Sequence, residues 1–154
     1  MTTSINSGGT AGDAANTQQA DGRIGALRVT SAAERLRCLR EVAGPHFIAL
    51  EHTVYDMLAM LSADYQGGFW HYYRLSNGGF YMAPSDTEQL RLVCEGNGFD
   101  GAVSADAAGL VATAMAYSHL SFRAGDERFG RAYDLLSRFI AQHAEARTIH
   151  AALD

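Results

Sequence analysis

The sequence contains no lysine, only two prolines and two cysteines, and no apolar run long enough to span a bilayer. Twelve arginines face seventeen aspartates and glutamates, which gives a formal net charge of -5 at pH 7. Proteins that bind DNA directly neutralise its phosphates with a basic surface, and this balance does not supply one. A mimic of the DNA backbone needs a much denser negative field than 19% charged residues can provide. The composition therefore argues against direct DNA binding and against DNA mimicry.

The cysteines and the N-terminal residues also restrict the possibilities. Cys38 and Cys94 have no CxxC partner, so we expect buried, reduced thiols and no redox or zinc site. The first residues lack the apolar core of a signal peptide, which favours a bacterial cytoplasmic protein.

The chain has the length of one domain, with 154 residues and 47% hydrophobic content. Residues 1–25 are rich in small and polar side chains and predict a flexible tail, because they cannot bury enough apolar surface to offset the entropy of ordering. The domain is expected over residues 26–154, with ordered structure beginning near Ser31.

Two helices are predicted in the first half of the domain. Ser31 and Glu34 have the spacing of a capping box, and Gly44 followed by Pro45 predicts the end of that helix. The next helix carries an apolar stripe at helical spacing, which predicts a buried face. Its members are Phe47, Leu50, Val54, Met57, Leu58 and Leu61.

The middle of the chain is typical of strands. Aromatic and β-favouring residues at 69–75 and 80–83 flank Asn77-Gly78, which predicts a hairpin with a type I′ turn. Residues 90–95 alternate apolar and polar side chains and predict a third strand.

Helical patterns return at 104–122, and Asp126 can cap one last long helix that runs past His143. The order of elements predicts an α+β fold: a single domain in which an antiparallel three- to four-stranded meander packs against about four helices.

The patterns that suggest chemistry are weak. Residues 96–101 spell GxGxxG, but no second parallel strand follows, so we interpret them as a glycine-rich connection. No two of the six histidines lie three or four residues apart, which argues against a helical metal site. We therefore expect no cofactor and no metal, and we predict that the protein is not an enzyme. The alternative is a small hydrolase that uses Cys94 or a His/Asp pair.

The predicted hairpin carries aromatic side chains on both faces. One face should pack on helices, while the other is either exposed for protein recognition or covered by a second layer. These aromatic residues are Trp70, Tyr72, Tyr73, Phe80 and Tyr81.

Four blocks of sequence are specific enough to suggest a family. They are ADYQGGFWHYY at 63–73, LSNGGFYMAP at 75–84, GNGF at 96–99 and SADAAG at 104–109. Over residues 45–120 the chain closely resembles the ArdB/KlcA antirestriction family. The resemblance implies a protein of plasmids or other mobile elements that relieves type I restriction of incoming DNA.

The resemblance leaves the mechanism open, and the composition favours protein contacts or an indirect route. The expected partner is a type I restriction enzyme or another host protein, with no nucleic acid or membrane bound directly. Five residues of the family blocks are candidates for an exposed partner surface: Tyr65, Trp70, Tyr81, Asn97 and Asp106.

Overall fold

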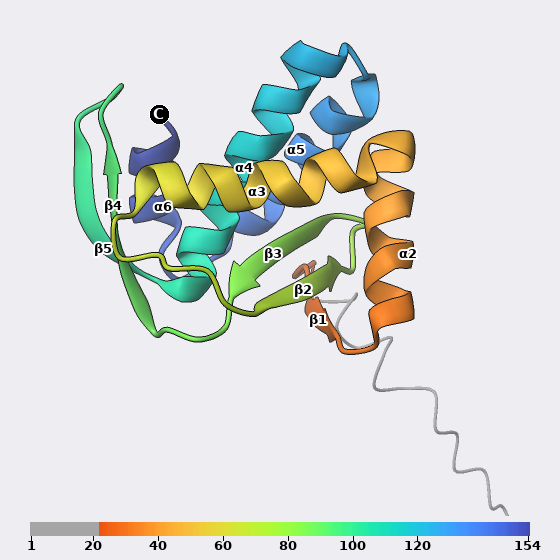
Figure 1. Ribbon diagram of the computed structural model, residues 1–154, viewed down its shortest axis with the longest axis horizontal. Coiled ribbons are helices and arrows are strands. Elements are labelled where there is room, and N and C mark those ends of the chain that lie inside the picture. The colour runs from red at the N-terminus through yellow and green to blue at the C-terminus, as the bar shows by residue number, and fades with distance from the viewer. Residues whose placement is uncertain (1–21) are drawn as a thin grey trace, which may run out of the picture.

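The computed structural model describes residues 22–154. Its strands are β1 (Ala26–Val29), β2 (Trp70–Leu75), β3 (Phe80–Pro84), β4 (Gln89–Cys94) and β5 (Phe99–Ser104). Its helices are α2 (Ala32–Ala43), the short 3-10 helix η1 (Gly44–His46), α3 (Phe47–Leu61), α4 (Ala105–Ala124), α5 (Glu127–Ala141) and α6 (Ala146–Leu153). Figure 1 shows α3 crossing α4, with α2 beside one sheet and the β4–β5 hairpin at the opposite edge. Of the helices in residues 22–154, none is long and apolar enough to cross a membrane.

The α+β class with antiparallel strands in a single domain is confirmed. The strands nevertheless divide into two sheets, β1-β2-β3 and β4-β5, so the prediction of one continuous meander is wrong. The division follows from α4, which packs along β3 and occupies the edge where a fourth strand would pair.

Helix α4 satisfies the backbone of this edge with side-chain hydroxyl groups. The Thr113 hydroxyl accepts a hydrogen bond from the Met82 N–H at 3.2 Å, and the Tyr117 hydroxyl donates to the Phe80 carbonyl at 2.7 Å. Both helix residues are fully buried. A covered strand edge cannot pair with another chain. Helix α4 is therefore both the central helix of the core and the element that covers the free edge of β3.

Three predicted helices are confirmed, and two of them, α2 and α4, have a serine side-chain cap. Ser31 caps α2 by accepting from the Glu34 N–H at 3.1 Å, and Gly44 ends the helix at a φ of 54°. The apolar stripe of α3 is buried at Leu50, Val54, Leu58 and Leu61. Ser104 caps α4.

The prediction of one long last helix is wrong, because the chain turns between α5 and α6. The α5 helix begins at its Asp126 cap as expected and ends at Ala141. Gln142 then turns its side chain to the backbone of Ile24, accepting from the N–H at 2.9 Å and donating to the carbonyl at 2.6 Å. These tertiary hydrogen bonds have no counterpart in the local helical pattern.

Two strands were not predicted. In β1, all residues except Val29 are exposed, and the strand forms by pairing with β2. In β5, Asp100 and Gly101 are poor strand formers, yet each pairs with a residue of β4. The GxGxxG residues therefore form a hairpin turn and the start of an antiparallel strand.

The hairpin between β2 and β3 is confirmed, but its turn is not type I′. That turn type requires a positive φ at both central residues, whereas Gly78 has a φ of 91° and no non-glycine residue of the described chain has a positive φ. The Gly78 N–H donates to the Leu75 carbonyl at 3.0 Å. A turn over 75–78 with its glycine in the left-handed region closes the hairpin.

The predicted tail falls mainly on residues 1–21, which lie outside the described residues. Of its last members, Ile24 is bonded to Gln142, and the Gly25 N–H donates to the Ser76 hydroxyl at 2.9 Å. The expectation that ordered structure begins near Ser31 is wrong, because β1 precedes it.

Candidate functional site

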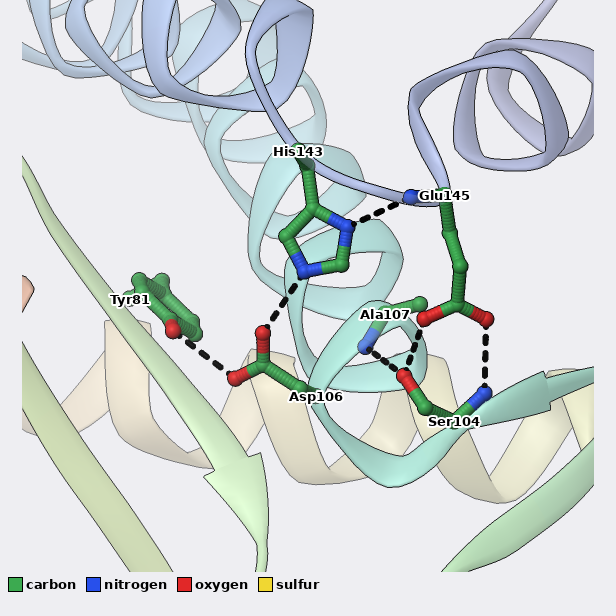
Figure 2. A network of polar contacts seen from close by, with 6 residues as sticks. All are labelled: Tyr81, Ser104, Asp106, Ala107, His143 and Glu145. Carbon is green, nitrogen blue, oxygen red and sulfur yellow. Dashed lines mark hydrogen bonds and ion pairs between the residues drawn. The ribbon is translucent and has the colours of Figure 1, made fainter. Parts of the chain in front are cut away.

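A polar network joins the start of α4 to β3 and to the link between α5 and α6 (Figure 2). Asp106 lies at its centre, in the first turn of α4. One carboxylate oxygen accepts from the Tyr81 hydroxyl at 2.8 Å, and the other lies 2.8 Å from the His143 Nε2. The positive end of a helix dipole stabilises a carboxylate in this position.

Both nitrogens of the His143 ring have partners. Nδ1 lies 3.0 Å from the Glu145 backbone N–H, which can only donate, so Nδ1 must be the acceptor. The neutral ring therefore carries its proton on Nε2 and donates it to Asp106. His143 thus links α4 to the residues that follow α5.

Glu145 forms the second half of the network. Its carboxylate accepts from the Ser104 backbone N–H at 3.0 Å and from the Ser104 hydroxyl. The same hydroxyl accepts from the Ala107 N–H at 3.0 Å, which completes the cap of α4. Two carboxylates, from Asp106 and Glu145, therefore occupy the N-terminal end of one helix (Figure 2).

The surroundings raise the pKa of two residues of the network, His143 and Tyr81. The hydrogen bond to Asp106 raises the pKa of His143 above its ordinary value, against the effect of burial. Protonation of Nδ1 would displace the Glu145 N–H, which limits this rise. Burial, and then the charge of Asp106, raise the pKa of Tyr81, so its phenol stays protonated and donates.

The hydrogen bonds of this network suit a structural role better than a catalytic one. A general base needs a free lone pair within reach of a substrate, and the His143 lone pair is taken by a backbone N–H. Cys94 is buried, and burial raises the pKa of its thiol, which disfavours the nucleophilic thiolate. Among residues 22–154, no three His, Cys, Asp or Glu side chains are grouped so that they could hold a metal ion.

The five predicted surface residues are found in three places. Tyr81 and Asp106 meet in the network, and the Tyr65 hydroxyl accepts from the Trp70 indole N–H at 2.9 Å. Asn97 lies apart, in the turn between β4 and β5.

The expected exposure of two of them is wrong. Trp70 is 4% exposed and Tyr81 is 2% exposed, because helices cover both faces of the hairpin. Trp70 packs against Tyr55 of α3, and Tyr81 stacks on Phe139 of α5. The second layer is therefore the correct alternative, whereas Asn97 is exposed and Tyr65 and Asp106 are partly exposed.

Sequence reasoning missed His143 and Glu145 as members of this site. The sequence predicts His143 within one long helix, and only the break after Ala141 turns its ring toward α4. The sequence carries no signal of that break beyond the polar residues at 142, 143 and 145.

Comparison with known proteins places these features in a family context. Residues 63–154 match the family described as "Antirestriction protein". The chain is 44% identical over 138 residues to the antirestriction protein KlcA of Escherichia coli, covering 85% of this chain and 94% of that protein. It is 39% identical over 128 residues to the putative antirestriction protein YubI of Escherichia coli K12, covering 79% of this chain and 90% of YubI.

A solved structure is also similar. It superposes with a TM-score of 0.77 at 40% identity and covers 85% of this chain and 95% of its own. It comes from work that describes KlcA and ArdB as having a novel fold and antirestriction activity against type I DNA restriction systems in vivo but not in vitro.

Proposed function

Because the chain belongs to the antirestriction protein family, we propose that it relieves type I restriction of incoming plasmid or phage DNA in a bacterial cytoplasm. The observation that carries this proposal is the match to KlcA, at 44% identity over nearly the full length of that protein. The similar fold of the solved relative supports it.

We further propose that the protein acts through protein contacts or indirectly, without mimicking DNA. Two exposed carboxylates are paired with arginine: Asp100 accepts from Arg91 at 2.7 Å, and Glu41 accepts from Arg74 at 3.1 Å. Paired acids produce a weak field at a distance, whereas DNA presents a regular row of unpaired charges. The net charge of -5 supports the same conclusion.

The relatives also suggest that a cellular component is needed. KlcA and ArdB act in vivo but not in vitro. A protein that bound and blocked the restriction enzyme by itself would inhibit the purified enzyme, so we propose that this chain acts through a further host protein.

We propose a non-enzymatic role, on the grounds that the Asp106–His143 pair is occupied internally and that Cys94 is a poor nucleophile. The hydrolase alternative makes a clear prediction. The alternative predicts that Cys94→Ser abolishes protection in a variant that melts like the parent, whereas our proposal predicts at most a small change, because serine is close to cysteine in size.

The decisive experiment measures the plating efficiency of unmodified phage on cells with an active type I system, with and without the protein. We expect a large rise on expression. Two controls should show no rise: cells that lack the restriction system, and phage already modified against it. Unchanged plating with abundant folded protein would overturn the proposal for that system.

A second assay distinguishes direct inhibition of the restriction enzyme from action through a further host protein. The purified protein is added to a purified type I enzyme and unmodified DNA, and cleavage is followed. The proposal predicts unchanged cleavage, whereas inhibition at micromolar concentrations would show that the restriction enzyme itself is the partner.

A further inference from the structure

A cavity of about 650 Å³ lies away from the polar network, where the end of α3, the end of β4, the middle of α4 and the end of α6 meet. Met60 and Leu61 contribute from α3, Val93 from β4, Met115 from α4 and Leu153 from α6. Figure 1 shows the elements that form it, with the β4–β5 hairpin beside α6 and the end of α3. A cavity of this size can hold one or two large side chains.

The wall next to the turn is fixed by Asn97. Its side-chain amide donates to the Ala152 carbonyl of α6 at 3.0 Å, and its side-chain oxygen accepts from the Phe99 N–H at 2.9 Å. One side chain therefore holds the turn against the helix. The cavity is preformed, which lowers the entropic cost of filling it.

Apolar groups of the cavity face solvent. Met60 is 70% exposed and Val93 is 39% exposed, which is unusual for large hydrophobic side chains that lie in one depression. Methionine adapts its shape to an incoming group, and both Met60 and Met115 line this cavity. Filling it would remove exposed apolar surface from water.

The charged residues of the lining all have the same sign. They are Glu95 and Asp154, and no arginine or histidine among residues 22–154 contributes to the lining. An acidic rim around an apolar floor favours an occupant that carries positive charge beside its apolar groups.

We propose that this cavity is the docking site for a partner protein that inserts large apolar side chains from a segment flanked by arginine or lysine. The inference rests on the proposed function, because it assigns the surface through which that function is exerted. The basic flanks meet Glu95 and Asp154, and the apolar side chains cover Met60 and Val93. Asn97, a predicted surface residue, then acts by positioning the wall.

A matched pair of variants on one helix tests the apolar floor in cells. Met60→Arg places a bulky positive group in the cavity, whereas Ile48→Arg places it at the other end of α3, where Ile48 is 59% exposed. We expect Met60→Arg to reduce protection of unmodified phage at least about tenfold, as loss of a central interface contact does. Ile48→Arg should keep full protection. If Met60→Arg protected as fully as Ile48→Arg and the wild-type protein, the docking site would be overturned and the proposed function would stand.

A second pair tests the rim. Glu95→Arg reverses a charge of the cavity, and Glu127→Arg reverses one at the start of α5, which lies outside it. Both residues are exposed, so neither change should unfold the protein, and thermal melts verify this. Reduced protection by Glu95→Arg alone is expected. Full protection by Glu95→Arg would overturn the basic character of the partner.

A third measurement does not depend on protection. Methyl resonances of the methionines are recorded by NMR while a peptide of leucines and arginines at helical spacing is added. The Met60 and Met115 signals should shift, whereas Met82, which is fully buried outside the cavity, should not.

The control peptide replaces each arginine with glutamate and should leave the Met60 signal unchanged. Equal shifts with both peptides, or no shift with either, would overturn the proposal. If the wild-type protein gives no protection in cells, the proposed function fails, and these spectra still decide whether the cavity binds a basic apolar segment.

Discussion

The β2–β3 and β4–β5 hairpins each have an Asn-Gly pair in the turn but lie in different surroundings. In each turn an asparagine side-chain oxygen accepts from the backbone N–H two residues later: Gly79 for Asn77 and Phe99 for Asn97, both at 2.9 Å. In each, the glycine between them has a positive φ, of 91° at Gly78 and 76° at Gly98. The Asn-Gly pair and its side-chain bond are therefore repeated, although the Gly78 N–H donates to the carbonyl three residues earlier, at Leu75, and the Gly98 N–H to the carbonyl four residues earlier, at Cys94.

The difference lies in what each hairpin packs against. Every residue of β3 is buried, whereas β4 alternates between buried and exposed residues. Asn77 donates to the Leu135 carbonyl of α5, and Asn97 donates to carbonyls of α6. An Asn-Gly pair can therefore lie beside the core or beside a surface, and the strands that flank it decide which.

The largest expected effect comes from adding a methyl group where α4 touches β3. A Cβ on Gly109 would lie 2.5 Å from the Cα of Ala83, with no side chain able to move away. We expect Gly109→Ala to lower the free energy of unfolding by about 2–3 kcal/mol, measured by urea denaturation.

The matched variant in the other hairpin is Gly101→Ala in β5. There the new Cβ would lie 3.1 Å from the tip of the Phe99 ring, which is only half-buried and can shift. A change below about 1 kcal/mol is expected. Similar losses for both glycines would show that the two hairpins are equally packed and would remove the contrast.

The second effect compares the two asparagines. Asn77→Ala and Asn97→Ala each remove one bond within the turn and at least one to a helix. Because Asn77 is the more buried, we expect a loss of about 2 kcal/mol for Asn77→Ala and about 1 kcal/mol for Asn97→Ala. Chemical denaturation of both variants measures this order, and the reverse order would contradict it.

The third effect is the pH dependence of the network that holds β3. Because Asp106 raises the pKa of His143 in the folded state, the stabilisation is complete below the unfolded value of about 6.5 and is lost as the pH rises through the folded value. Asp106→Asn should therefore cost more stability near pH 6 than near pH 8.

Thermal melts at these two pH values test the dependence. Asp134→Asn, which removes an exposed carboxylate of α5, provides the control and should show no such difference. An identical cost of Asp106→Asn at both pH values would mean that His143 does not change charge in this range.

The smallest effect is expected on the exposed face of the β4–β5 hairpin. Arg91 and Asp100 form an exposed ion pair, and the hydrogen bond from Arg91 lowers the pKa of Asp100. Solvent and salt screen such pairs, so Asp100→Asn should leave the melting temperature unchanged within error at neutral pH. A clear fall in melting temperature would show that this hairpin depends on its outer face.

Much of the fold could be predicted because its signals are local. Ser31, Gly44 and Ser104 mark helix ends through hydrogen bonds to nearby residues, and the stripe of α3 follows from helical spacing alone. The burial of Cys38 and Cys94 was also predicted and is confirmed. The family suggested by the sequence blocks is confirmed by the relatives.

The candidate site was predicted only in part, because its bonds join distant segments. Tyr81 and Asp106 were named, but for an exposed surface, and their actual neighbours, His143 and Phe139, lie far along the chain. Periodicity reports which side of an element is apolar and not what covers it. The cavity beside Met60 was not predicted for the same reason.

The sequence by itself determined the class of fold, the positions of three helix starts, the Asn-Gly turn of the first hairpin and the family. Only the tertiary structure decided that the strands form two sheets, that Trp70 and Tyr81 are interior residues, and that Asn97 fixes the wall of an open cavity. The physical reason is the distance along the chain over which each kind of interaction acts. Caps, turns and periodicity act over a few residues, whereas α4 covers β3 and α6 meets β5 through contacts that form only when the chain has folded.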